Sequence, residues 1–107
     1  MSQTVAAFVP ASARGRRSAA RRVEVVEAAL RSGYTDVKVF GSEARGDDGD
    51  QSDVDLAVTP TGSHSLFKLM RLGIDLGELL DERVDVVSEP DLRPKVAERV
   101  RQEAALL

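Results

Sequence analysis

The stretch VFGSEARGDDGDQSDVDLAV, residues 39–58, joins two apolar runs through a polar loop. The first run ends at Phe40, and the second carries two aspartates, Asp53 and Asp55, separated by one valine. Successive side chains of a strand point to opposite faces, so both carboxylates are expected on one face, with Val54 and Leu56 on the other. Two adjacent carboxylates repel each other unless a cation lies between them. The stretch therefore predicts a site for a positive ion, and a divalent metal is the candidate.

The segments on both sides of this stretch predict a small α+β domain. Apolar spacing and turn residues indicate helices at residues 18–33, 66–80 and 94–107, and strands at residues 35–40, 53–59 and 83–87. Ser18 is expected to cap the first helix and Gly33 to end it. This order predicts an α+β fold in which a small mixed sheet of about three to four strands has helices packed on one face.

Each helix carries an apolar stripe that predicts its buried face. The expected stripe of the first helix consists of Val23, Val26 and Leu30. The second helix has Leu66, Leu69, Met70, Gly73, Leu76, Leu79 and Leu80. The last helix has Val96, Val100, Ala104 and Leu107. These side chains are the candidate core between the helices and the sheet.

The composition of the 107 residues fits one globular domain, expected at residues 18–107 after a flexible basic arm at residues 1–17. No acidic residue precedes Glu24, whereas five arginines do. Such an arm could contact nucleic acid or an acidic partner. It lacks interleaved aromatic residues, and the net charge of the chain is −3, so a solvated tail is expected and nucleic-acid binding is not.

Residue content also indicates the cellular location of the protein and the kind of metal ion that it could bind. No apolar run approaches the roughly 20 residues of a membrane span, and the first residues lack the order of a signal peptide. A cytoplasmic protein is therefore expected. The chain has no cysteine and one histidine, which leaves carboxylates as metal ligands and favours a hard ion such as Mg²⁺.

Two further features add to the aspartate pair. Gly41-Ser42 follows the first strand directly, where backbone N–H groups and a hydroxyl can approach a phosphate. Asp85 holds the outward position of the strand RVDVV. If this strand pairs with DVDLAV, three carboxylates meet on one face, as a phosphoryl or nucleotidyl transfer site with two Mg²⁺ ions requires. Asp85 could also accept the proton of an attacking hydroxyl.

Simpler interpretations of the same residues remain open. The aspartate pair could lie on the solvated face of an edge strand, the Gly-Ser pair could be only a turn, and the third aspartate could be a surface residue. The combination of three motif parts favours a site. Arg45 could pair with Asp47 or Asp50, or it could reach a phosphate, and it is a candidate nucleotide-binding residue.

The spacing of Gly41-Ser42, ten residues, and Asp53-Val54-Asp55 resembles the signature of the minimal nucleotidyltransferases, small relatives of the DNA polymerase β superfamily. The resemblance includes residues 44–47, Ser52 and the later strand with a third aspartate, and it extends from residue 23 to the end of the chain. It implies a polymerase β-like fold that binds a nucleoside triphosphate with Mg²⁺, transfers a nucleoside monophosphate and releases pyrophosphate.

The same resemblance implies roles for individual residues. By matching position, Gly41 and Ser42 would hold the triphosphate, Asp53 and Asp55 would bind the metals, and Asp85 would act as the base and complete the metal site. Many family members of this length resemble antitoxins of HEPN/MNT toxin–antitoxin pairs, which add AMP from ATP to a tyrosine of the HEPN ribonuclease. The resemblance thus predicts a Mg²⁺-dependent protein adenylyltransferase, with a HEPN-type toxin as its partner and acceptor.

Two alternatives belong to other classes of function. The chain could be a binding module that inhibits its partner by stoichiometric contact, without using the site for catalysis. It could also transfer the nucleotide to a small molecule, as the aminoglycoside nucleotidyltransferases do. Those enzymes are longer and carry an acceptor domain, so a protein acceptor is expected here.

Overall fold

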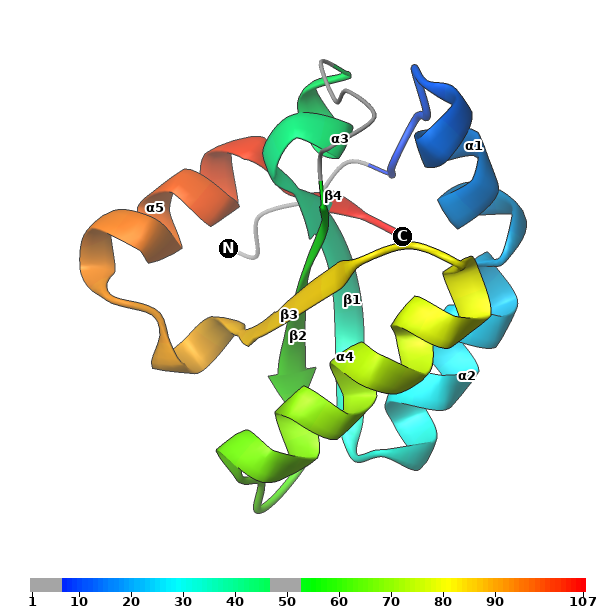
Figure 1. Cartoon of the computed structure of the whole chain (residues 1–107). Coiled ribbons are helices and arrows are strands. Elements are labelled where there is room, and N and C mark those ends of the chain that lie inside the picture. The colour runs from blue at the N-terminus through cyan, green and yellow to red at the C-terminus, as the bar shows by residue number, and fades with distance from the viewer. Residues whose placement is uncertain (1–6, 47–52) are drawn as a thin grey trace.

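The computed structural model describes residues 7–46 and 53–107. In chain order the elements are α1 (Ala13–Ala20), α2 (Arg22–Arg31), β1 (Tyr34–Phe40), α3 (Gly41–Arg45), β2 (Val54–Pro60), α4 (Leu66–Leu80), β3 (Val84–Ser88), the 3-10 turn η1 (Glu89–Asp91), α5 (Pro94–Glu103) and β4 (Ala105–Leu106) (Figure 1). None of the helices in this described part has the length and apolar character that crossing a membrane requires.

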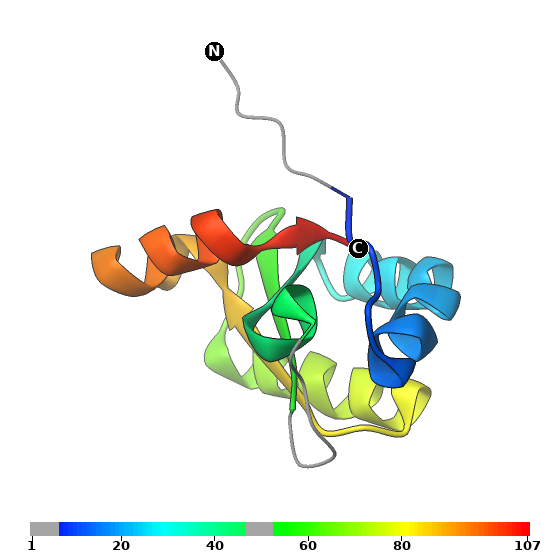
Figure 2. The same ribbon diagram turned by 90° about the horizontal axis from the view of Figure 1, so that it is seen from above.

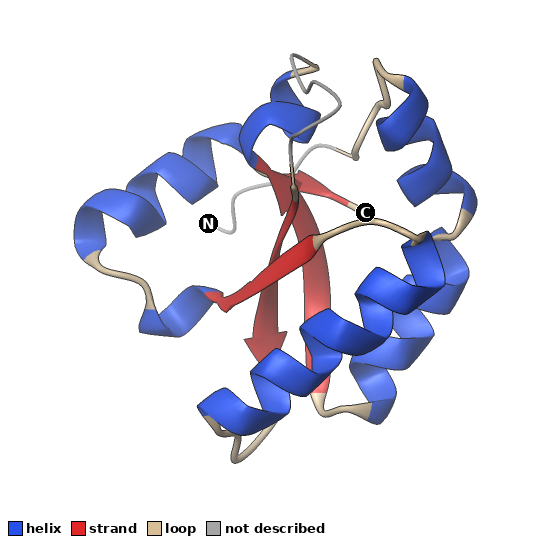
Figure 3. Cartoon of the chain, in the orientation of Figure 1, coloured by secondary structure: helices blue, strands red, loops and turns tan. Residues whose placement is uncertain are grey.

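The four strands form one mixed sheet in the order β3-β2-β1-β4 (Figure 3). The strand β1 pairs antiparallel with β2 and with β4, whereas β2 and β3 are parallel. A parallel neighbour needs a long crossover, which here contains α4. The predicted α+β fold with a mixed sheet is therefore confirmed, and β3 lies at one edge of the sheet.

The main core lies between one face of the sheet and the helices α2 and α4. Val54, Leu56 and Val58 alternate along β2 and are fully buried on this face, as the pattern predicts. The helix α5 lies on the other side of the sheet from α4 (Figure 2). The expected one-sided packing of helices thus describes α2 and α4, while α5 borders the opposite face.

The buried face of the first long helix differs from the predicted one. Val25 and Ala29 of α2 are fully buried, whereas Val23 and Leu30 are 62% and 53% exposed. Apolar residues are adjacent in this segment, so two overlapping stripes fit the helical period equally well. Contact with the sheet chooses between them.

The stripe of α4 is also only partly as predicted. Leu69, Leu76 and Leu80 are buried, and Leu72, which the expected stripe lacks, is buried with them. Leu66 and Met70 are 72% and 60% exposed, so their assignment to the core was wrong. The sheet covers only one narrow side of this helix, and the spacing rule cannot tell how wide that side is.

The N-terminal boundary of the first helix is corrected by α1. Ser18 does not cap a helix, because it is buried inside α1, and Ser12 is the cap, accepting a hydrogen bond from the Gly15 N–H at 2.9 Å. Residues 13–17, expected in the arm, are therefore the start of α1.

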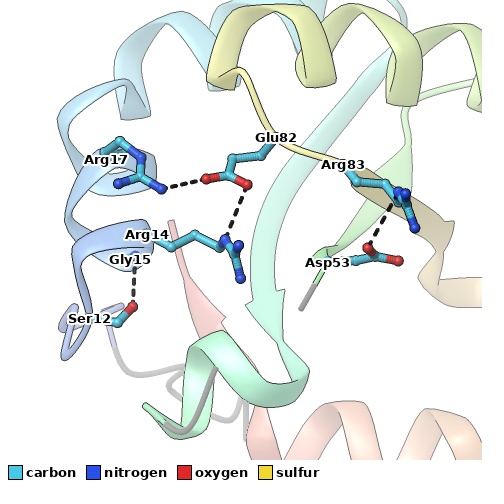
Figure 4. A network of polar contacts seen from close by, with 7 residues as sticks. All are labelled: Ser12, Arg14, Gly15, Arg17, Asp53, Glu82 and Arg83. Carbon is cyan, nitrogen blue, oxygen red and sulfur yellow. Dashed lines mark hydrogen bonds and ion pairs between the residues drawn. The ribbon is translucent and has the colours of Figure 1, made fainter. Parts of the chain in front are cut away.

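Arg14 and Arg17 of this helix form ion pairs with Glu82 (Figure 4), and the hydrogen bond from Arg17 lowers the pKa of that carboxyl. Residues 1–6 of the expected arm lie outside the described residues.

The C-terminal helix is shorter than predicted. It ends at Glu103, after which Ala105 and Leu106 form β4 against β1. Leu107 is buried in the main core. The last residues leave the helix because the free edge of β1 offers their backbone groups hydrogen bonds that a solvent-exposed helix end lacks.

Gly73 lies in the middle of α4, where a glycine lowers helix stability. A Cβ at this position would lie 3.6 Å from the Val84 carbonyl oxygen and 3.7 Å from Val86 Cγ2, which are ordinary contact distances. We expect Gly73→Ala to raise the free energy of unfolding by about 0.5–1 kcal/mol, measured by urea denaturation. The control is Gly77→Ala, whose Cβ would lie 3.0 Å from the Glu82 carbonyl oxygen, and it should bring no comparable gain.

Candidate active site

The turn from β1 into α3 brings Gly41 against the second aspartate of the Asp-Val-Asp motif. Gly41 has φ +74, and a Cβ at this position would lie 2.5 Å from Asp55 Oδ2. A residue with a side chain would therefore be strained and would displace this carboxylate. Ser42 follows in the first turn of α3, so the Gly-Ser pair and Asp55 border the same space.

The parallel pairing of β2 with β3 places two of the predicted carboxylates side by side. Asp55 and Asp85 are direct register partners on neighbouring strands. Burial raises the pKa of the Asp55 carboxyl, and the nearby negative charges of Asp85 and Asp53 raise it further, while Arg45 partly offsets the effect. The sequence alone left this pairing conditional, and the structure supplies it.

Asp53 lies immediately before β2 and makes a different contact. Its Oδ1 atom is 3.8 Å from Nε of Arg83, the residue that precedes β3 (Figure 4). In residues 7–46 and 53–107, no three His, Cys, Asp or Glu side chains are grouped closely enough to hold a metal ion. The expected convergence of three carboxylates is therefore met by the register pair Asp55 and Asp85, while Asp53 acts on Asp55 through its charge and also lies near Arg83.

A cleft of about 470 Å³ lies over the face of the sheet that carries Asp55 and Asp85. The sheet and α3 line one side of it with Phe40, Gly41, Ser42, Arg45, Asp55, Asp85 and Val87. The segment leading into α5, and α5 itself, line the other with Leu92, Val96, Arg99 and Glu103. This volume is typical of small-molecule sites, and the charged lining of the cleft suits a charged ligand.

Two arginines border the cleft from different helices. Arg45 of α3 forms an ion pair with Glu103 of α5 at 3.1 Å, a partner that the sequence interpretation did not include. The partners considered for it, Asp47 and Asp50, lie outside the described residues. Arg99 of α5 was not predicted as a site residue. The only signal in the sequence was the helical spacing of Val96, Arg99 and Glu103, which places all three on one face of α5.

The chemistry of the three aspartates fits a hard divalent cation, although the described residues do not group three ligands at metal-binding distance. All nearby candidate ligands are carboxylate oxygens, which Mg²⁺ prefers. Burial is the main cause of the raised pKa of Asp55, and the repulsion from Asp85 and Asp53 that adds to it is the kind of interaction that a cation relieves. Asp53, Asp55 and Asp85 are therefore the residues that would hold the ion.

Replacing Asp55 should stabilise the free protein at neutral pH. The unfolded chain releases this proton more readily than the folded chain, so ionised Asp55 lowers stability as pH rises above the usual carboxyl pKa. We expect Asp55→Asn to have a higher Tm than the unmodified chain at pH 7, and the difference to shrink as pH falls toward 3. Thermal unfolding followed by circular dichroism between pH 3 and 8 measures this, and an equal Tm at all pH values would contradict it.

A family model described as Polymerase beta, Nucleotidyltransferase matches residues 34–107. The protein adenylyltransferase MntA of Thermococcus cleftensis is 38% identical to this chain over 73 residues. The matched segment spans 68% of this chain and 74% of that protein. The residues matched by the family model include the cleft and its carboxylates.

Solved structures extend the comparison. One that is provisionally described as a minimal nucleotidyltransferase is 41% identical, has a TM-score of 0.78, and covers 87% of this chain and 95% of its own. A chain from the complex of tri-AMPylated Shewanella oneidensis HEPN toxin with MNT antitoxin has a TM-score of 0.67 over 83% of this chain and 70% of its own. At 16% identity, that second likeness concerns the fold alone.

Proposed function

Because the chain belongs to the polymerase β nucleotidyltransferase family, we propose that it transfers AMP from ATP to a hydroxyl group of a partner protein. The observation that carries this proposal is the shared cleft, in which Gly41-Ser42 faces the neighbouring carboxylates of Asp55 and Asp85. The name of the similar protein adenylyltransferase MntA supports a protein as the acceptor.

The reaction needs groups for the triphosphate and for one proton. The N–H groups at the start of α3 and the Ser42 hydroxyl bind the triphosphate. The acceptor oxygen attacks the α-phosphorus, a new P–O bond forms, and the bond to the bridging oxygen breaks so that pyrophosphate leaves. Asp85, which is exposed on β3, takes the proton of the acceptor hydroxyl. The cleft would hold the triphosphate next to the acceptor hydroxyl, so the two reactants would not have to meet by diffusion for the chemical step.

Divalent metal belongs to this proposal. Mg²⁺, with two ions expected, would be held by Asp53, Asp55 and Asp85, and when bound it neutralises charge on the triphosphate and its leaving group. Arg83, at 3.8 Å from Asp53, competes for one of these carboxylates. Metal binding should therefore raise the Tm of the free chain, because it removes the repulsion at Asp55.

A HEPN-fold toxin is the proposed partner, with a tyrosine as the accepting residue and this chain as its antitoxin. The complex of tri-AMPylated Shewanella oneidensis HEPN toxin with MNT antitoxin supports this choice, since one of its chains shares the present fold.

The decisive experiment incubates this chain with [α-³²P]ATP, Mg²⁺ and each HEPN-fold protein of the source genome. Label that stays on a HEPN-fold protein during denaturing gel electrophoresis supports the proposal. Mass spectrometry then locates the modified residue. Neutralisation of a toxin without any label would instead assign the chain to the class of stoichiometric inhibitors.

Arg99 is expected to contribute charge to nucleotide binding. It lines the cleft from α5, opposite the Gly-Ser turn, and charge-assisted hydrogen bonds to phosphate are the stronger kind. We expect Arg99→Gln to raise KM for ATP about tenfold, in line with the loss of roughly 1.5 kcal/mol for one hydrogen bond to a charged group. Arg101→Gln, on the same helix but not lining the cleft, is the matched control. An unchanged KM in the Arg99 variant would remove this residue from the site.

A further inference from the structure

One side of α4 presents a continuous apolar surface to solvent. Leu66, Phe67, Met70 and Ile74 are 72%, 80%, 60% and 57% exposed, and their spacing places them on neighbouring turns of one side of the helix. Single exposed apolar side chains are common in folded proteins, but four adjacent large ones indicate a surface that binds another molecule. We call these four residues the α4 apolar face.

A groove of about 380 Å³ runs beside this face, between α4 and β3. Met70, Gly73 and Ile74 line it from the helix, and Val84 and Val86 line it from the strand. We call it the α4–β3 groove. Gly73 has no side chain that could fill this groove. A Cβ there would meet its neighbours at ordinary contact distances, so the packing of α4 does not by itself require a glycine at this position.

The strand that forms the other wall of the groove lies at the edge of the sheet. Within the described residues β3 pairs only with β2, so its outer edge has no strand neighbour. Edge strands with apolar surroundings readily accept an extended peptide segment through backbone hydrogen bonds, with pockets that take alternate side chains.

The groove and the candidate active site lie on opposite faces of the sheet at β3 and share one lining residue. Asp85 lines both the α4–β3 groove and the cleft that contains Gly41 and Asp55. The side chains of a segment paired with the outer edge of β3 would alternate between the two faces of the sheet, so that some would enter the α4–β3 groove and the next would lie beside Asp85 on the cleft face.

We infer that the α4–β3 groove and the α4 apolar face bind the acceptor protein, through an extended segment that carries the reacting hydroxyl to Asp85. This inference rests on the proposed function, because it names how the acceptor reaches that site. The apolar lining fits the side chains of a protein segment. A nucleotide fits it poorly, since Arg83 is the one cationic residue that lines the groove in the described part of the chain, and it already contacts Asp53.

The test uses the full chain and, as the probe, the HEPN-fold protein that takes up label in the transfer assay. Met70→Asp and Ile74→Asp should each raise KM for that protein at least tenfold and leave KM for ATP within about twofold. Val23→Asp makes the same change at a residue of α2 that is 62% exposed, and it should alter neither value. Gly73→Leu fills the groove without adding charge and should also raise KM for the acceptor. Circular dichroism checks that each variant is folded.

The outcomes separate this inference from the proposed function. Transfer with an unchanged acceptor KM in the folded Met70, Ile74 and Gly73 variants would overturn the inference and leave the proposed function intact. Binding of a HEPN-fold protein, measured by calorimetry, that is lost in these variants but never accompanied by transfer would support the docking surface and contradict the proposed function. If the chain alone is a dimer in light scattering and Met70→Asp makes it a monomer, the face belongs to a second copy and the inference is wrong.

Discussion

The double variant Asp53→Asn/Asp55→Asn is expected to lose transfer of AMP by at least about 10³-fold, equivalent to roughly 4 kcal/mol of transition-state stabilisation. The amide side chains keep the size of the carboxylates but remove the two negative charges that the motif provides. Asp55 lies beside Gly41, pairs in register with Asp85 and lines the cleft with both of them. Under the proposed function, removing these charges would weaken binding of the Mg²⁺ ions that accompany the triphosphate.

The control for this variant removes the same number of charges elsewhere. Asp36 and Asp81 both have left-handed backbone conformations, with φ of 51 and 52, which asparagine tolerates as well as aspartate does. Neither lines the cleft, so Asp36→Asn/Asp81→Asn should retain transfer within about twofold of the unmodified rate. Initial rates of label incorporation at saturating ATP compare the two variants. Transfer that persists in Asp53→Asn/Asp55→Asn would show that the reaction uses other residues.

The second large effect is expected from Gly41→Ala, which adds one methyl group at the turn into α3. This methyl would lie 2.5 Å from Asp55 Oδ2, closer than nonbonded atoms approach, and φ at this position is +74. The carboxylate has to move, and the N–H groups of α3 move with the turn. We expect transfer to fall at least about 10²-fold, because a displacement of about 1 Å in a reacting group has this cost.

Backbone strain alone would also lower stability, so the control has to separate strain from the site. Gly33 also has a positive φ, at +89, and its nearest neighbour would be the flexible Lys68 Nζ at 3.3 Å. Gly33→Ala should therefore lose about 1–2 kcal/mol of stability, as Gly41→Ala does, while keeping transfer. Urea denaturation and the transfer assay on both variants make the comparison. Equal activity in the two variants would contradict the role assigned to Gly41.

The motif residues were predictable because their pattern is local. Alternation along β2 places Val54 and Leu56 in the core whatever the rest of the chain does, so Asp55 must face the other way. A glycine directly after β1 predicts a turn, and the structure places the Gly-Ser pair at the start of α3. The family signature could be recognised from these features alone, and the matches to the polymerase β nucleotidyltransferase family confirm it.

Features that depend on packing between distant segments were predicted less well. Spacing alone predicts a stripe of Val23, Val26 and Leu30 for α2. The sheet instead selects Val25 and Ala29, with Val26 partly buried against the core, because two apolar faces overlap in this segment. Arg99 was missed because nothing in its own segment shows that α5 stands over the cleft.

The sequence by itself determined the order of the main elements from α2 to α5, the apolar and acidic faces of β2, and the family, whereas α1 and β4 were missed. These follow from periodicity and spacing, which act over a few residues. Only the tertiary structure decided that Asp85 is the register partner of Asp55, that Arg83 contacts Asp53, and that the apolar side of α4 remains exposed beside β3. The physical reason is that register, ion pairing and burial are properties of surfaces that meet. A residue's neighbours in the chain do not specify which surface it will meet.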